Sequence, residues 1–303
     1  MSDSSKAMRL KAKIRNLAKD KNITAQVILQ NYMFEGFLER LSCSKYKNNF
    51  ILKGGMVIAA IVGLDNRSTM DLDATLRKIH LNEENIRTAI SNICAIEIGD
   101  GTNFTLDSIG YIRADDIYGG YRVGLTAQFD TIKTPLTMDI STGDIITPQA
   151  IKFSFHGIFD QKKKIELWAY NLETIMAEKL ETILSRNIFN TRSRDFYDIY
   201  ILSNTQSFNI GLLREAISAT ATHRGTEKII TNKQELFNMI SKNKDLQDRW
   251  LKYQHRFNYA SNVTWEKVMI KLALLCDLEL NPSIELLTEV KEKAEKHIDV
   301  QQD

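Results

Sequence analysis

The stretch Phe50-Ile-Leu-Lys-Gly-Gly55 joins a short apolar run to a second one, at residues 56–62. The first run is typical of a buried strand, and the second has the composition of a buried helix. Glycines at such a turn let the backbone approach a phosphate closely, and the first N–H groups of the helix then point at the anion. Paired glycines also occur at turns for packing alone, so the stretch is not specific by itself.

Two carboxylates follow this turn, in Asp71-Leu72-Asp73. Side chains alternate along a strand, so both carboxylates are expected on one face while Leu72 faces the core. Like charges at this spacing repel each other, and a divalent cation such as Mg²⁺ between them relieves the repulsion. A solvated edge strand or turn, where aspartate is also common, is the alternative interpretation.

A third carboxylate stands alone in an apolar stretch, Leu136-Thr-Met-Asp139-Ile-Ser141. Alternation places the three large apolar side chains towards the core and Asp139 on the opposite face. Three carboxylates on one sheet beside a glycine turn suit two-metal phosphoryl transfer, in which the cations neutralise the triphosphate and activate the attacking hydroxyl. Asp71, Asp73 and Asp139 are therefore the candidate catalytic and metal-binding residues.

Around these motifs the chain divides into two parts of different character. Amphipathic helices are expected at residues 7–19 and 25–41, the second with Thr24 as its N-cap. Residues 49–165 show short β-rich runs and one helical stretch at 83–93, whereas strand patterns nearly vanish after residue 171. We predict an α+β fold: a mixed sheet with flanking helices over residues 1–168, an all-helical domain over 169–303, and a site in the cleft between them.

Composition narrows the class of protein. The 303 residues are 43% hydrophobic and 26% charged, which is typical of a folded globular chain. The net charge is only +2, so attraction to nucleic acid must come from local patches. The N-terminus lacks a signal-peptide pattern, and the longest apolar run is too short to cross a bilayer. Three scattered cysteines, Cys43, Cys94 and Cys276, indicate a reduced, cytoplasmic protein.

Several stretches in a fixed order carry a resemblance to a known family. They are Phe37-Leu-Glu-Arg-Leu41, Phe50-Ile-Leu-Lys-Gly-Gly55, Arg67-Ser-Thr-Met-Asp-Leu-Asp73, Met138-Asp-Ile140, Tyr170-Asn-Leu-Glu-Thr-Ile-Met-Ala-Glu-Lys-Leu180 and Arg194-Asp-Phe-Tyr-Asp-Ile-Tyr200. This ordered set resembles the nucleotidyltransferase core of the AbiEii toxins of type IV toxin–antitoxin systems. The resemblance spans roughly the first two thirds of the chain, and the set is far more specific than any one piece.

The resemblance implies a DNA-polymerase-β-like nucleotidyltransferase that uses NTP and Mg²⁺ at a two-metal site. The acceptor in some relatives is the 3′ end of tRNA, and the outcome is growth arrest. It also implies an antitoxin encoded nearby that opposes the toxin without a stable complex. Many such cores carry a serine or another small hydroxyl residue at the glycine turn, whereas Gly55 and Met56 stand here. Phosphate contact is therefore expected from the backbone of Gly54 and Gly55, aided by Lys53.

Two residues of the predicted helical domain complete the candidate nucleotide-binding set. Lys179 borders the apolar face of a predicted helix, and the resemblance places the family's nucleotide-binding lysine there. A solvated surface lysine is the alternative. Asp195 and Asp198 share a face of the next predicted helix, three residues apart. Asp195 is the candidate to orient Lys179, the ribose or an arginine, and an ordinary helix N-terminal carboxylate is its alternative.

Two further features have a binding and a structural interpretation. Lys162-Lys163-Lys164 is predicted to be the exposed tip or edge of a hairpin, with RNA contact as the second interpretation. The aromatic residues of the C-terminal part are predicted to be core rather than a base-stacking platform; they are Trp250, Tyr253, Phe257, Tyr259 and Trp265.

Three functions are consistent with these motifs. The first is nucleotide transfer to an RNA acceptor, the second is transfer to a protein hydroxyl, and the third is a non-catalytic nucleotide-binding module of the same fold. The complete set of three carboxylates favours an enzyme, and the sequence does not separate an RNA acceptor from a protein acceptor.

Overall fold

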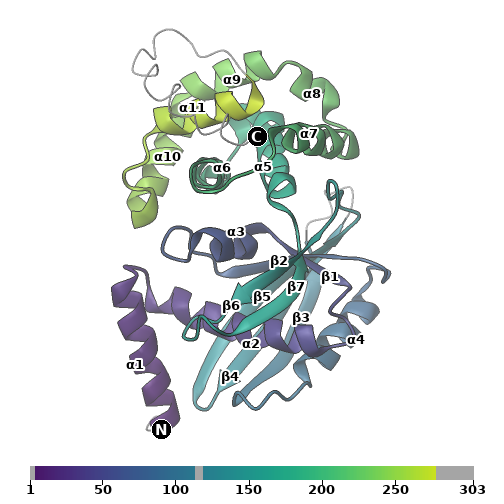
Figure 1. Ribbon diagram of the computed structural model, residues 1–303, viewed down its shortest axis with the longest axis vertical. Coiled ribbons are helices and arrows are strands. Elements are labelled where there is room, and N and C mark those ends of the chain that lie inside the picture. The colour runs from purple at the N-terminus through teal and green to yellow at the C-terminus, as the bar shows by residue number, and fades with distance from the viewer. Residues whose placement is uncertain (1–3, 113–118, 278–303) are drawn as a thin grey trace. The chain divides into compact units, whose positions relative to one another are not determined.

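The three candidate carboxylates lie on a seven-stranded mixed sheet (Figure 1). The computed structural model describes residues 4–112 and 119–277 of the chain. The strands are β1 Phe50–Lys53, β2 Asp71–Leu76, β3 Thr102–Tyr111, β4 Gly120–Phe129, β5 Ile132–Thr142, β6 Ile151–His156 and β7 Lys164–Ala169. Their order is β3-β4-β5-β2-β1-β7-β6. The β2–β5 and β1–β7 pairs are parallel and the others antiparallel, which confirms the predicted α+β class with a mixed sheet.

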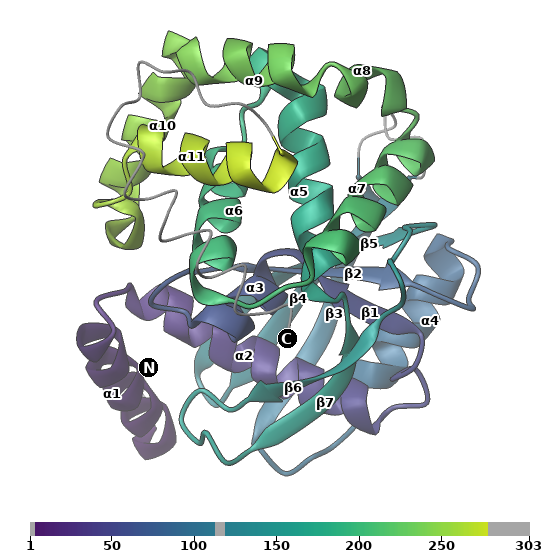
Figure 2. The same ribbon diagram turned by 45° about the horizontal axis from the view of Figure 1, so that its top comes forward.

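Helices α2 and α4 cover one face of this sheet (Figure 2). The first helices of the chain are α1 Ser5–Asp20, α2 Ala25–Cys43, α3 Gly54–Val62 and α4 Glu83–Cys94. Phe37 of α2 meets Phe104 of β3 with the ring centroids 5.9 Å apart. The Thr24 hydroxyl accepts a hydrogen bond from the backbone N–H of Val27 at 3.3 Å, which confirms the predicted N-cap of α2.

The two faces of the sheet differ in polarity because side chains alternate along each strand. The face beneath α2 and α4 is apolar and buried; on β2 and β5 its side chains are Leu72, Ala74, Leu76, Leu136, Met138 and Ile140. Each buried leucine or isoleucine stabilises the fold by about 1.5–3 kcal/mol. A slip of one residue would turn Asp73 and Asp139 into this core, so the apolar pattern also fixes the register that the site needs.

The lysine run 162–164 lies at the β6–β7 hairpin, as predicted. Lys163 pairs there with Glu35 at 2.8 Å and with Glu39 at 2.5 Å, both from α2. The burial of Lys163 lowers its pKa, but the hydrogen bonds and charges of the two glutamates outweigh burial and raise it. These contacts give Lys163 a structural role, in which it holds the hairpin on α2.

The chain divides into two compact units. Unit 1 comprises Met1–Ile175 and Gly211–Ala219, and unit 2 comprises Met176–Ile210 and Thr220–Asp303. The later helices are α5 Leu172–Arg186, η1 Asn187–Phe189, α6 Ser193–Thr205, α7 Ile210–Arg224, α8 Glu227–Thr231, α9 Lys233–Lys242, α10 Lys244–Arg256, η2 Asn258–Ala260 and α11 Trp265–Cys276. The predicted domain boundary after residue 168 stays a prediction, and residues 278–303 of that predicted domain lie outside the described residues.

Unit 2 has an aromatic core. Trp250 is 1% exposed and stacks on Tyr253 with the ring centroids 5.5 Å apart. Trp265 lies 6.2 Å from Trp250 and 5.2 Å from Phe196 of α6. Burial of these rings confirms the structural interpretation of Trp250, Tyr253 and Trp265.

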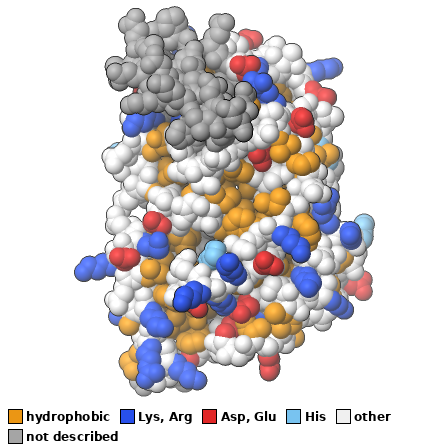
Figure 3. Space-filling model, viewed as in Figure 1, with side chains coloured by type: hydrophobic (Ala, Val, Ile, Leu, Met, Phe, Trp, Pro, Cys, Tyr) orange, Lys and Arg blue, Asp and Glu red, His pale blue; other side chains and the backbone are white. Residues whose placement is uncertain are grey.

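Side chains of both charges lie on the described surface that Figure 3 displays, with hydrophobic side chains between them. Lysine and arginine side chains lie interspersed there with aspartate and glutamate, as the net charge of +2 leads us to expect. None of the helices that the structure describes combines the length and the apolar character needed to cross a membrane.

Candidate active site

Backbone pairing sets the predicted catalytic carboxylates side by side in unit 1. Asp73 of β2 lies opposite Asp139 of β5 in a parallel pair. Lys53 of β1 lies opposite Asp73, and Arg122 of β4 lies opposite Asp139, both in antiparallel pairs. Residues that are directly paired project from the same face of a sheet. The four side chains therefore form one row, here called the charge row, with a cation at each end and two carboxylates between them.

Asp71 joins this face at the start of β2, two residues before Asp73, and its side chain is exposed. Asp139 is turned towards Arg122: Nε donates to Oδ1 at 2.8 Å, and Nη2 donates to Oδ2 at 2.7 Å. In residues 4–112 and 119–277 no three acidic, histidine or cysteine side chains are grouped so that they could hold a metal ion. The oxygen donors of the three carboxylates fit Mg²⁺ chemically, provided that Asp139 exchanges Arg122 for the cation.

The neighbouring carboxylates raise the pKa of Arg122. The hydrogen bonds that Arg122 donates to Asp139 raise the pKa of Arg122 most, the negative charge of Asp139 adds to this, and burial opposes both. Asp71 and Asp73 raise the pKa further through their charges. Arg122 therefore interacts electrostatically with all three candidate metal ligands.

The two glycines are required by close packing. Gly54 has a φ of +66°, and a Cβ atom on it would collide with the carboxylate of Asp73. A Cβ atom on Gly55 would lie 2.8 Å from Thr69 Oγ1 and 3.1 Å from the guanidinium of buried Arg67. Helix α3 begins at Gly54 without a side-chain cap from the preceding residue. The turn thus brings the positive end of α3 against β2, where backbone N–H groups suit an anion.

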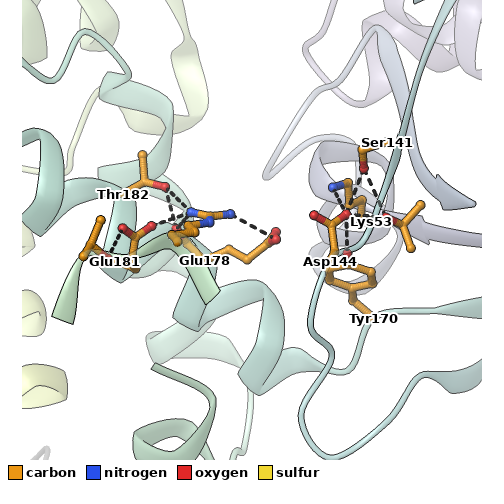
Figure 4. Close-up of polar contacts among 10 residues, drawn as sticks. Lys53, Ser141, Asp144, Tyr170, Glu178, Glu181 and Thr182 are labelled. Carbon is orange, nitrogen blue, oxygen red and sulfur yellow. Dashed lines mark hydrogen bonds and ion pairs between the residues drawn. The ribbon is translucent and has the colours of Figure 1, made fainter. Parts of the chain in front are cut away.

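Lys53 contacts a carboxylate that the sequence analysis did not single out (Figure 4). Its ammonium pairs with Asp144 Oδ2 at 2.6 Å and lies 5.7 Å from the ring centroid of Tyr170. Ser141 and Tyr170 donate to the same oxygen at 2.8 and 2.9 Å, and Thr75 also donates to it. Asp144 therefore ties β1, β2 and β5 together behind the glycine turn. The role of Lys53 in phosphate binding stays a prediction.

The ionisation of Asp144 reflects these contacts. Burial by itself raises the pKa of Asp144. The charge of Lys53 and the hydrogen bonds from Lys53, Thr75 and Ser141 outweigh burial and lower the pKa to about 2.

Asp144→Asn is expected to lower the free energy of unfolding at pH 7 by about 2 kcal/mol, since one pKa unit corresponds to about 1.4 kcal/mol. The folded-state pKa lies below the unfolded value, so this stabilisation is present above about pH 4 and is lost as the pH falls towards 2. Urea unfolding of both proteins at pH 7 and pH 3 measures it, and the difference should be about halved at pH 3. Asp107→Asn, an exposed change on β3, is the control. An equal difference at both pH values would contradict this origin of the stability.

Lys179, Asp195 and Asp198 lie together in unit 2 and are here called the Lys179 cluster. Lys179 Nζ on α5 pairs with Asp195 Oδ1 and with Asp198 Oδ2 of α6, each at 2.7 Å. The side chains of Lys179, Asp195 and Asp198 are only 13%, 10% and 0% exposed. The interpretation of Lys179 as a solvated surface lysine is therefore wrong. Its contact with nucleotide stays a prediction, as does that of Asp195.

A second ion cluster supports the same stretch of α5 (Figure 4). Arg224, near the end of α7, donates to Thr182 at 3.0 Å and pairs with Glu178 at 3.2 Å and with Glu181. Glu181 is 2% exposed. This cluster fixes the segment that carries Lys179, and nothing in the local sequence around Arg224 indicates it.

The fold is similar to those of several solved structures. A crystal structure from H. pylori, described as a "putative nucleotidyltransferase", is 18% identical with a TM-score of 0.51 over 84% of this chain and 95% of that chain. JHP933 from Helicobacter pylori is 16% identical with a TM-score of 0.49 over 92% and 99% of the two chains. An antigenic nucleotidyltransferase-like protein from Paracoccidioides brasiliensis is 12% identical, with a TM-score of 0.35 over 60% and 84%. The first of these structures shares its fold with this chain.

The family is established from the sequence. None of the curated proteins matches the chain. The profile of the family described as "Nucleotidyl transferase AbiEii toxin, Type IV TA system" matches residues 36–270, which include every motif of the charge row and of the Lys179 cluster. The chain therefore belongs to the AbiEii family of nucleotidyltransferase toxins of type IV toxin–antitoxin systems.

Proposed function

We propose that this toxin transfers a nucleotide from NTP to the 3′ end of an RNA, with tRNA as the expected acceptor and Mg²⁺ as cofactor. The observation that carries the proposal is the pairing of Asp73 with Asp139 on one face of the sheet, directly beside the start of α3. Two acidic side chains next to an uncapped helix start suit a cation and a phosphate at the same place.

The carboxylates and glycines of the candidate site in unit 1 have the following proposed roles. Asp71 and Asp73 hold the cations, and Asp139 is the third ligand and helps to activate the acceptor hydroxyl. The bound cations, when present, neutralise charge on the triphosphate and favour ionisation of that hydroxyl. Backbone N–H groups of Gly54 and Gly55 at the start of α3 contact a phosphate.

In unit 2 we propose that Lys179 contacts the triphosphate as a point charge. The 2.7 Å contact with Asp195 holds the ammonium in a defined position, so its orientation does not have to be selected on binding. Asp195 accordingly acts through Lys179.

The test is incubation of the purified protein with Mg²⁺, total RNA and each labelled NTP in turn. We expect one NTP to label an RNA at its 3′ end, and we expect chelation of Mg²⁺ to stop the reaction. Asp71→Ala should abolish the label because it removes a cation ligand. Labelling by Asp71→Ala at the wild-type rate would contradict the mechanism. Label on protein would select transfer to a side-chain hydroxyl, and no label together with no Mg²⁺-dependent NTP binding would select a non-catalytic module.

We also propose that the toxin acts in the cytoplasm, where NTPs and tRNA are available, which agrees with the free thiols of Cys43, Cys94 and Cys276. The antitoxin is proposed to oppose its effect without a stable complex. Co-expression should then restore growth, while affinity purification of the toxin should recover no antitoxin.

A further inference from the structure

Arg122 holds the carboxylate of Asp139, the residue proposed above as the third cation ligand. Both oxygens of this carboxylate accept a hydrogen bond from the guanidinium, at 2.8 and 2.7 Å. Such a two-bonded fork matches the geometry of a carboxylate and orients it. Asp139 can therefore bind a cation only after its hydrogen bonds with Arg122 break.

The Arg122–Asp139 ion pair can nevertheless separate at little cost in free energy. The side chain of Arg122 is 61% exposed, whereas that of Asp139 is 24% exposed. An exposed ion pair contributes little net stability, because water solvates both partners when they separate. A divalent cation held also by Asp71 and Asp73 brings twice the charge of a guanidinium, so it competes well for the carboxylate.

The released guanidinium stays close to the reacting groups. Arg122 is anchored on β4 directly opposite Asp139, on the face that carries Asp71 and Asp73. A freed arginine beside a cation and a triphosphate has a clear chemical partner, since its planar fork matches a phosphate as well as it matches a carboxylate.

We propose that Arg122 is a displaceable counter-ion, which holds Asp139 while no divalent cation is bound and binds a phosphate once a cation has taken Asp139. The phosphate comes either from the nucleotide or from the backbone of an acceptor RNA. The inference rests on the proposed function, because it takes Asp139 as a cation ligand. It adds that cation binding and phosphate binding are coupled through one side chain.

The first test measures Mn²⁺ binding without nucleotide, by electron paramagnetic resonance of the free ion. Arg122→Gln should bind Mn²⁺ up to about fivefold more tightly than the wild type, because no guanidinium competes for Asp139. Asp139→Asn should bind it more weakly, and adding Arg122→Gln to Asp139→Asn should then have no effect. Arg87→Gln is the matched control, since it also removes an exposed arginine from an ion pair, with Glu83 on α4.

The second test measures phosphate binding in the presence of Mn²⁺. Arg122→Gln should weaken binding of a non-hydrolysable NTP if the nucleotide supplies the phosphate, or binding of a labelled RNA if the acceptor supplies it, by about tenfold in either case. Arg122→Lys keeps the positive charge but cannot form two parallel hydrogen bonds to a phosphate. Its affinity for the ligand should therefore lie between those of the wild type and Arg122→Gln. If Arg122→Gln binds both the NTP and the RNA as tightly as the wild type does, Arg122 does not bind a phosphate.

The results separate this inference from the proposed function. If Asp73→Asn weakens Mn²⁺ binding and Arg122→Gln leaves it unchanged, the exchange is wrong and the metal site stands. If none of the aspartate variants changes Mn²⁺ binding, the proposed metal site itself is wrong, and the exchange fails with it.

Discussion

Asp73→Asn is expected to lower the rate of nucleotide transfer by about a thousandfold, because a catalytic metal ion contributes several kcal/mol to stabilisation of the transition state. Asp73 lies in the middle of the charge row, opposite both Lys53 and Asp139, and its carboxylate packs against Gly54. Asparagine keeps the shape and removes the negative charge that a hard cation requires. The measurement is kcat/KM for the NTP that labels RNA, together with the thermal unfolding midpoint.

The close contact with Gly54 decides the control for this prediction. A substitution that moved the glycine turn would lower activity through the fold, so the unfolding midpoint of Asp73→Asn must stay within a few degrees of the wild type. Asp107→Asn, an exposed change on β3, should leave both quantities unchanged. A loss of less than tenfold in folded Asp73→Asn would show that the carboxylate is not a metal ligand.

The elements of the fold were predictable because their signals are local. Alternation over Leu136–Ser141 assigns Met138 to the core and Asp139 to the opposite face, and β5 has that arrangement. The hydroxyl of Thr24 caps α2 through the nearby N–H of Val27. Alternation of apolar and polar residues along a strand, or a capping residue within three positions of its partner, can be recognised in a single sequence.

Two ion pairs of unit 1, Lys53–Asp144 and Arg122–Asp139, were not predictable, because sheet pairing alone brings their partners together. Lys53 and Asp144 are 91 residues apart, and they meet only because β1, β2 and β5 are neighbours in the sheet. Arg122 lies opposite Asp139 through the register of the β4–β5 pair. A sequence indicates which residues carry charge, but the strand order decides which charges meet. Lys53 was therefore a candidate while its partner Asp144 was missed, and Asp139 was a candidate while its partner Arg122 was missed.

A mutation of Lys179 is expected to affect stability as well as activity, because Lys179 pairs with Asp195 and Asp198. Lys179→Met is expected to lower the free energy of unfolding by about 3–5 kcal/mol, because it removes the cation that pairs with Asp195 and with fully buried Asp198. Urea unfolding followed by tryptophan fluorescence measures this effect. A Trp168→Phe background confines the signal to Trp250 and Trp265 of unit 2.

The same cluster allows the structural role of Lys179 to be separated from its proposed role in nucleotide binding. Combining Lys179→Met with Asp195→Asn and Asp198→Asn removes all three charges, so much of the lost stability should return. If nucleotide transfer stays low in this stable triple variant and in folded Asp195→Asn, while Mg²⁺ binding is retained, the pair acts on the triphosphate. Wild-type transfer by the triple variant would make the Lys179 cluster purely structural, and wild-type stability of Lys179→Met alone would contradict the buried ion pair.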